Sequence, residues 1–149
     1  VIYEPNLDEC FYAWKDVGAY LNEKRISVSD QHEMKNALLA TGFPYNDFGK
    51  LEGYIDLFTY FARHTSGLRR LGSAAVDLAY TACGRVEGFY EYGLHAWDVA
   101  AGVIIVKEAG GTITDFKGGN DYIFGAEMLA SNTVLHPSLL DAAMTHFRK

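Results

Sequence analysis

Two segments in the second half of the chain carry start and stop signals of helices, and each lies between short β-like runs. GSAAVDLAYTACG, residues 72–84, begins with Ser73 before good helix formers and ends at Gly84. WDVAAGVIIVKEAGG, residues 97–111, stops at two glycines. The strand-like runs are GLRRL at 67–71, VEGFYEY at 86–92 and TITDF at 112–116. Alternating strands and helices require parallel pairing through crossover helices, so this order predicts an α/β fold.

The remaining segments extend this prediction to one α/β domain over residues 1–149. Residues 9–29 have aromatic and β-branched runs broken at Gly18 and Asn22, as in a meander, and KNALLATGFP at 35–44 is a buried strand entering a loop. Apolar residues at helical spacing predict a helix over 51–62, with Asp47 as its N-cap. AEMLASN at 126–132 is a further strand, and residues 136–149 form a closing helix. We expect a mainly parallel or mixed sheet of about five strands with helices on both faces.

Charge and composition narrow the classes of function. The chain has 13 basic and 19 acidic residues, a net charge of −6 and no run of Lys or Arg, so broad binding to nucleic acid is not expected. No stretch of about 18 apolar residues occurs, and we expect no membrane span. Cys10 and Cys83 stand far apart, which favours two buried thiols in a reducing cytoplasm. Because the chain opens directly on the strand-like Val1-Ile2-Tyr3, we interpret it as a piece of a longer protein.

Polar residues occur at both predicted helix starts, which is where α/β sheets bind their ligands. Small residues at 72–75 leave the backbone N–H groups near Ser73 and Ala74 open to an anion or a hydroxyl. Glu91 ends one predicted strand, and Asp98 begins the next predicted helix. Both carboxylates also have a structural interpretation: Asp98 as a first-turn residue that offsets the helix dipole, and Glu91 as a solvated strand-end charge.

Three neighbouring residues give weaker signals. Arg70 is typical of a charged strand end, and His95 is typical of a loop or packing histidine, with no second histidine at ligand spacing. Trp97 is expected in the core. A small anionic ligand is compatible with the acidic composition, because helix N-termini and metal ions bind anions without net positive charge.

The order of these residues closely resembles the C-terminal signature of the inositol monophosphatase family. That signature is a W-D-x-A-A-G-type segment followed by an E-A-G-G end. Here residues 97–102 read WDVAAG and residues 108–111 read EAGG. The resemblance is long and ungapped from residue 68 to 111. It is supported upstream by IYEPNLDECFYAWKDVGAYLN and ATGFP, so it covers essentially the whole chain.

The resemblance implies Mg²⁺-dependent hydrolysis of a small-molecule phosphate monoester, such as an inositol phosphate, by metal-activated water. It makes Asp98 a Mg²⁺ ligand, gives Glu91 a hydrogen bond with a substrate hydroxyl, and sets the backbone at Ser73 and Ala74 beside the substrate ring. Arg70 and His95 are further candidates for substrate contact. Carboxylates suit Mg²⁺, a hard cation that prefers oxygen ligands. The resemblance also implies a layered sandwich and a homodimer.

One part of the family pattern is missing. The upstream glutamate and the D-P-[LIV]-D-G-T segment, which supply most metal ligands in the family, do not occur, and EPNLDE at 4–9 is not that motif. We therefore expect residues 1–149 to form the carboxy-terminal domain of such an enzyme. Its partner would be the missing amino-terminal half, and the chain alone would be inactive.

Two alternatives stay open. A nucleotide 3′-phosphatase or a fructose-1,6-bisphosphatase of the same superfamily would share these features. A binding or assembly module without catalysis is the alternative from a different class. The upstream coding sequence separates them: a D-P-[LIV]-D-G-T segment there favours an enzyme, and its absence favours a module.

Overall fold

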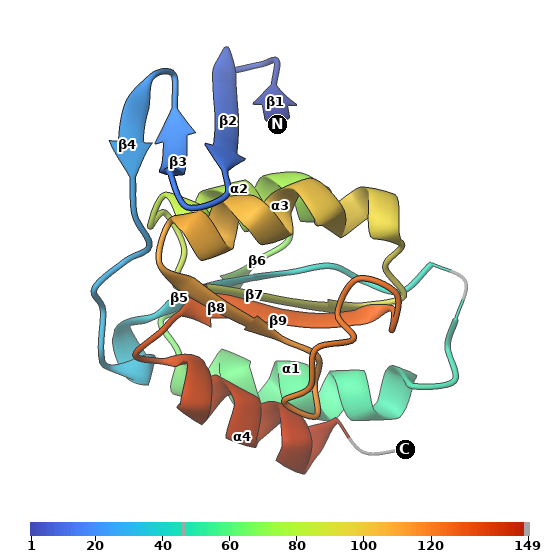
Figure 1. Ribbon diagram of the computed structural model, residues 1–149. Coiled ribbons are helices and arrows are strands. Elements are labelled where there is room, and N and C mark those ends of the chain that lie inside the picture. Colours follow the sequence, from blue (N-terminus) through green and yellow to red (C-terminus); the bar gives the residue numbers. More distant parts are fainter. Residues whose placement is uncertain (46, 148–149) are drawn as a thin grey trace.

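Two β-sheets and two pairs of helices alternate in four layers in the computed structural model, which describes residues 1–45 and 47–147 (Figure 1). A small sheet lies outermost and packs on the first helix pair, which covers one face of a larger sheet. The second helix pair covers the opposite face of that larger sheet. None of the described helices is long and apolar enough to cross a membrane.

The small sheet is the meander expected from residues 9–29. Its antiparallel strands follow one another in chain order: β1 (Ile2–Glu4), β2 (Glu9–Trp14), β3 (Gly18–Leu21) and β4 (Lys24–Ile26). Because successive side chains of a strand point to opposite faces, Phe11 and Ala19 are buried toward the helices. The cross-strand pair Tyr12 and Tyr20 stacks on the outer face, with ring centroids 5.5 Å apart.

The larger sheet confirms the expectation of five strands in a mixed arrangement. Its strands are β5 (Leu38–Thr41), β6 (Gly67–Arg69), β7 (Gly88–Tyr92), β8 (Gly111–Thr114) and β9 (Glu127–Asn132). Their order in space is β6-β5-β7-β9-β8. Both partners of β5 are parallel to it, whereas β9 pairs antiparallel with both β7 and β8. Strand β7 is therefore central and covered by helices on both faces.

The helices lie in the predicted segments, with differences at their ends. On one face lie α2 (Ala74–Ala82) and α3 (Ala96–Glu108), and on the other α1 (Leu51–His64) and α4 (His136–His146); a short 3₁₀ turn, η1, covers Met34–Asn36. The expected N-cap of α1 is wrong: Lys50 takes that position, while Asp47 Oδ1 accepts the Gly49 N–H at 2.9 Å. The predicted final helix residues 148–149 lie outside the described residues.

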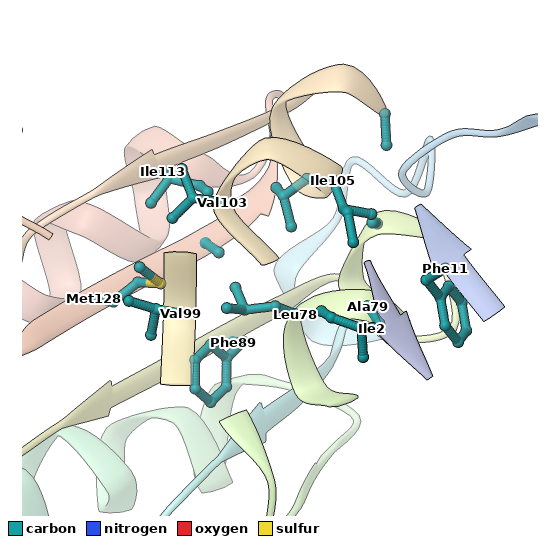
Figure 2. Close-up of a cluster of buried hydrophobic side chains, with 14 of the residues drawn as sticks. Ile2, Phe11, Leu78, Ala79, Phe89, Val99, Val103, Ile105, Ile113 and Met128 are labelled. Atoms are coloured by element: carbon teal, nitrogen blue, oxygen red, sulfur yellow. The ribbon is translucent and has the colours of Figure 1, made fainter. Parts of the chain in front are cut away.

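Each face of the larger sheet has its own hydrophobic core. On β7, Phe89 points into the core with α2 and α3, while Tyr90 points into the core with α1 and α4. Figure 2 shows the first core, in which Phe89, Leu78 and Val99 meet side chains from the small sheet and from β9. Fully burying one such side chain contributes about 1.5–3 kcal/mol to the stability of the folded chain. This core holds α2 and α3 at fixed positions over the sheet.

Helices α2 and α3 approach closely at a glycine. A Cβ atom placed on Gly102 of α3 would lie 2.5 Å from Leu78 Cδ1 and 2.6 Å from Leu78 Cβ, closer than real Cβ contacts. Only hydrogen fits at this contact. The glycine of the WDVAAG segment therefore sets the spacing of the two helices whose N-termini face the candidate site.

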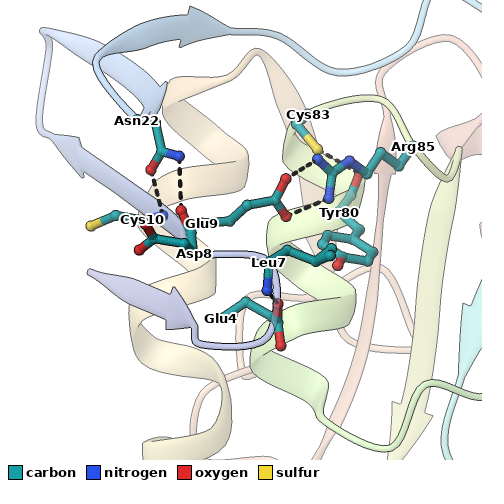
Figure 3. A network of polar contacts seen from close by, with 9 residues as sticks. All are labelled: Glu4, Leu7, Asp8, Glu9, Cys10, Asn22, Tyr80, Cys83 and Arg85. Carbon is teal, nitrogen blue, oxygen red and sulfur yellow. Dashed lines mark hydrogen bonds and ion pairs between the residues drawn. The ribbon is translucent and has the colours of Figure 1, made fainter.

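A polar network attaches the small sheet to the end of α2 (Figure 3). The Arg85 guanidinium makes two hydrogen bonds to the Glu9 carboxylate, one of them 2.7 Å long, and lies 4.5 Å from the Tyr80 ring centroid. Cys83 and Cys10 are free thiols. Both are half-buried, so the expectation of two buried thiols is not met: Cys10 alternates with the buried Phe11 on β2 and points to the outer face of the small sheet, and Cys83 is the C-cap of α2.

Candidate functional site

A cleft of about 780 Å³ opens where strands β5 and β7 end and helices α2 and α3 begin. This is the expected ligand edge of an α/β sheet. The predicted residues Glu91, Asp98, Ser73 and Ala74 all line it, as do Arg70 and His95. The structure thus brings together all six candidate site residues from segments separated in the sequence. The other lining residues are Gly42, Phe43, Pro44, Tyr45, Asp47, Gly72, Ala75, Tyr92, Gly93, Leu94, Trp97 and Ala126.

Glu91 is the buried carboxylate of the cleft. It is 8% exposed, so its interpretation as a solvated strand-end charge is wrong, because the central strand β7 is covered on both faces. Burial raises the pKa of Glu91 to about 7; repulsion by Asp98 adds to this increase, and Arg70 opposes it. A carboxyl group with a pKa near neutrality can accept a hydrogen bond from a bound hydroxyl when ionised, or donate one to it when protonated.

Asp98 belongs to the first turn of α3 and combines two roles. The backbone N–H of the N-cap residue His95 donates to Asp98 Oδ2 at 2.9 Å. One carboxylate oxygen thus caps the helix, which agrees with the structural interpretation of Asp98 as a first-turn residue. The half-buried side chain also lines the cleft. Because the cap takes one oxygen, the other remains available to a cation.

The start of α2 forms a second wall of the cleft. Ser73 is the N-cap, and its Oγ accepts the Val76 N–H at 3.5 Å. Ala74 and Ala75 follow without polar side chains and line the cleft. Helical bonding leaves the first N–H groups of a helix without an intrahelical partner, so this wall can donate to an oxygen of a ligand.

The cleft rim is aromatic. Arg70 donates to the Tyr45 hydroxyl, and its guanidinium lies 5.8 Å from the Phe43 ring centroid and 5.7 Å from that of Tyr45. His95 stacks on Trp97 with ring centroids 4.5 Å apart. Trp97 is 80% exposed, so its expected core location is wrong: as the second residue of α3 it lies at the mouth of the cleft.

Sequence reasoning missed Asp77, which lies on α2 behind the cleft. This aspartate is 1% exposed, and neither carboxylate oxygen has a hydrogen-bond partner among the described residues. Burial raises its pKa to about 7, with a further contribution from Glu91 and an opposing one from Arg70. The one available signal was a carboxylate between Val76 and Leu78 in an otherwise apolar helix.

The cleft fits a Mg²⁺ site only in part. Asp98 offers a half-buried carboxylate oxygen, the ligand type that Mg²⁺ prefers. Over residues 1–45 and 47–147, no three His, Cys, Asp or Glu side chains gather in a metal-binding arrangement. Asp98 can therefore offer one ligand to a cation, and the described residues do not form a complete metal site around it.

The chain is similar in sequence to known proteins over almost its whole length. The family model described as the inositol monophosphatase family matches residues 1–148. "Nus factor SuhB" of Pseudomonas aeruginosa is 40% identical over 148 residues, which are 98% of this chain and 55% of that protein. "Inositol-1-monophosphatase" of Mesorhizobium japonicum is 39% identical over 142 residues, 95% of this chain and 53% of that protein. The chain spans about half the length of these relatives.

The fold is shared with solved structures. The structure of inositol monophosphatase from Anabaena superposes with a TM-score of 0.92 at 41% identity, covering 97% of this chain and 57% of that chain. The extragenic suppressor protein suhB from Bartonella henselae gives a TM-score of 0.89 at 39% identity, covering 95% of this chain and 54% of the other.

Proposed function

Because the chain belongs to the inositol monophosphatase family, we propose that it forms the carboxy-terminal part of a phosphatase that hydrolyses a polyol phosphate monoester, such as an inositol phosphate. One observation carries the proposal. Glu91 from a strand end and Asp98 from a helix start face the same cleft, beside the open N-terminus of α2. Family membership supports a phosphatase at the level of the superfamily, and the specific substrate is our inference.

In this proposal each residue has a separate task. Asp98 would give its uncapped oxygen to Mg²⁺, which when bound supplies positive charge for the attacking water and the leaving oxygen. Glu91 would hydrogen-bond a substrate hydroxyl, and the backbone N–H groups after Ser73 would donate to hydroxyl oxygens carried by the substrate ring. Arg70 and His95 would contact the substrate at the rim.

We further propose that the remaining Mg²⁺ ligands come from an amino-terminal half. Two observations support this. The relatives are nearly twice as long as this chain, and the outer face of the small sheet carries the aromatic cluster of Tyr12, Trp14 and Tyr20. Trp14 is 59% exposed there. Exposed clusters of large apolar side chains mark interaction surfaces.

The test is phosphate release from inositol monophosphate with Mg²⁺. We expect none from the 149-residue chain alone and turnover after the amino-terminal half of the same protein is added. Turnover by the chain alone would show that further carboxylates are unnecessary, and no turnover by the complete protein would refute the phosphatase.

In the complete protein, Asp98→Asn keeps an oxygen for the helix cap but loses the charge, so Mg²⁺ dependence should weaken sharply. Asp56→Asn, an exposed change on α1, is the matched control.

One observation favours a second candidate function. Several relatives of about 40% identity carry the name "Nus factor SuhB". A non-catalytic role in a macromolecular assembly is therefore the alternative for this chain. An Asp98→Asn variant of the complete protein that fully replaces the wild type in cells while lacking turnover would favour that role.

A further inference from the structure

Gly42 occupies an unusual place at the floor of the cleft. It follows the last residue of β5 and lines the cleft beside Glu91. A Cβ atom placed on Gly42 would lie 2.2 Å from the carboxyl carbon of Glu91 and 2.2 Å from each carboxylate oxygen. Real Cβ atoms essentially never approach another heavy atom within 3.0 Å. The Glu91 carboxylate therefore fills the volume that any side chain at position 42 would need.

The backbone does not explain a glycine at this position. Seven glycines of the described chain have positive φ angles, a conformation that favours glycine, and Gly42 is not one of them. An alanine could adopt the backbone conformation of residue 42 without strain. The three atoms nearest to its Cβ would all belong to the end of the Glu91 side chain. The glycine at position 42 is thus explained by the volume of the Glu91 side chain and not by the backbone conformation.

The charges around Glu91 do not fix its position by themselves. Asp98 repels the carboxylate, and Arg70, which is exposed at the rim, attracts it. Both groups can be approached by other ions or ligands. The backbone of residue 42, directly after β5, limits where the carboxylate can lie, because the carboxylate occupies the place of a Cβ atom there.

We propose that Gly42 is a positioning residue for Glu91: the absence of a side chain at residue 42 creates the space that holds the Glu91 carboxylate at the cleft floor. This sets where a bound hydroxyl can meet the carboxylate, because a hydrogen bond requires an O···O distance of about 2.5–3.0 Å. The consequence for substrate selection rests on the proposed function of Glu91.

The first test is structural and needs no activity. Crystal structures of the 149-residue chain and of Gly42→Ala are compared, with Gly49→Ala as control. Gly49 belongs to the same loop, and its Cβ would meet only Asp47 Oδ1, at 3.2 Å. We expect the Glu91 carboxylate to move by about 1 Å or more in Gly42→Ala, since a 2.2 Å approach must open to ordinary contact, while β5 and β7 stay in place. An unmoved Glu91, with the strand end displaced instead, would overturn the proposal.

The second test is a double-mutant cycle in the complete protein. Gly42→Ala and Glu91→Ala are made singly and together, and KM is measured for inositol monophosphate and for a simple aryl phosphate. We expect Gly42→Ala to raise KM for the polyol substrate about tenfold, since a hydrogen bond to a charged group contributes about 1.5–3 kcal/mol. In the Glu91→Ala background the change should have no further effect.

The outcomes separate the two proposals. If Gly42→Ala is equally harmful with and without the Glu91 side chain, Gly42 does not act through Glu91 and the positioning role is refuted. If Glu91→Ala leaves discrimination between the two substrates unchanged, the substrate role of Glu91 fails, while the structural comparison still decides the positioning role.

Discussion

The buried carboxyl group of Asp77 gives a prediction whose sign follows from its pKa. Neither oxygen has a hydrogen-bond partner among the described residues, and burial raises the pKa from its ordinary value of 3.8 to about 7. Between these two pH values the folded chain holds the proton and the unfolded chain releases it. The free energy of unfolding therefore falls as pH rises from about 4 to 7, and the full penalty is present above pH 7.

The size of the effect follows from the same values. A pKa difference of about 3 corresponds to at most about 4 kcal/mol at about 1.4 kcal/mol per pH unit. Asn has nearly the same shape as the neutral acid and cannot ionise, so Asp77→Asn should leave stability close to the wild type at low pH. From pH 5 to pH 8 its advantage should grow by about 2–3 kcal/mol, because the wild type loses its bound proton over this range.

The assay is urea unfolding of the 149-residue chain and its variants at pH 5, 6.5 and 8, followed by circular dichroism. Asp56→Asn, an exposed change on α1, is the control and should shift stability equally at all three pH values. A stability difference for Asp77→Asn that does not grow with pH would refute the reasoning. It would mean that the ionised carboxylate is paired or hydrated in the folded chain.

Three further changes test the packing and electrostatics. Gly102→Ala should lower the unfolding free energy by about 1–3 kcal/mol, since its Cβ has no room against α2; unchanged urea stability would show that the helices separate freely. Burial lowers the pKa of His136 from 6.5 to about 4, so stability should fall by up to about 3 kcal/mol as pH drops through that range. His136→Asn should remove this pH dependence, and an unaltered profile would contradict it. Arg85→Met should lower the free energy of unfolding by about 1 kcal/mol in low salt and by less in high salt, because its ion pair with Glu9 is partly exposed. A loss of stability that does not depend on salt would assign the effect to packing.

Local signals predicted the elements well because they act within a few residues. Ser73 as an N-cap and the glycines after α2 and α3 are chain-local features, and both helices begin where the sequence indicated. The cap assigned to Asp47 failed because an aspartate can equally bond a nearby N–H in a turn, here that of Gly49. Sequence does not say which of these two local bonds forms.

Exposure was predicted less well, because it depends on what packs over a residue. Trp97 is mostly exposed although its type favours burial, and Glu91 is buried although its type favours solvent. Both lie at the junction of β7 and α3, where the cleft leaves an aromatic side chain exposed and a carboxylate buried. Gly42 and Asp77 escaped attention for a related reason: each acts on Glu91 from a distant segment, and only the folded sheet brings them near it.

The strand order of the larger sheet also constrains how the chain reaches its structure. Central strand β7 pairs in parallel with β5, and Leu39 of β5 lies opposite Gly88 of β7, which is 49 positions further along the chain. Its other neighbour, β9, is separated from it by all of α3 and β8. Pairings of this kind require the closure of long loops, so chain entropy is lost before the stabilising sheet contacts form. This loss slows folding. The small meander, by contrast, is built from neighbouring hairpins and can form early, so β7 is expected to be the last strand to gain protection from hydrogen exchange during refolding.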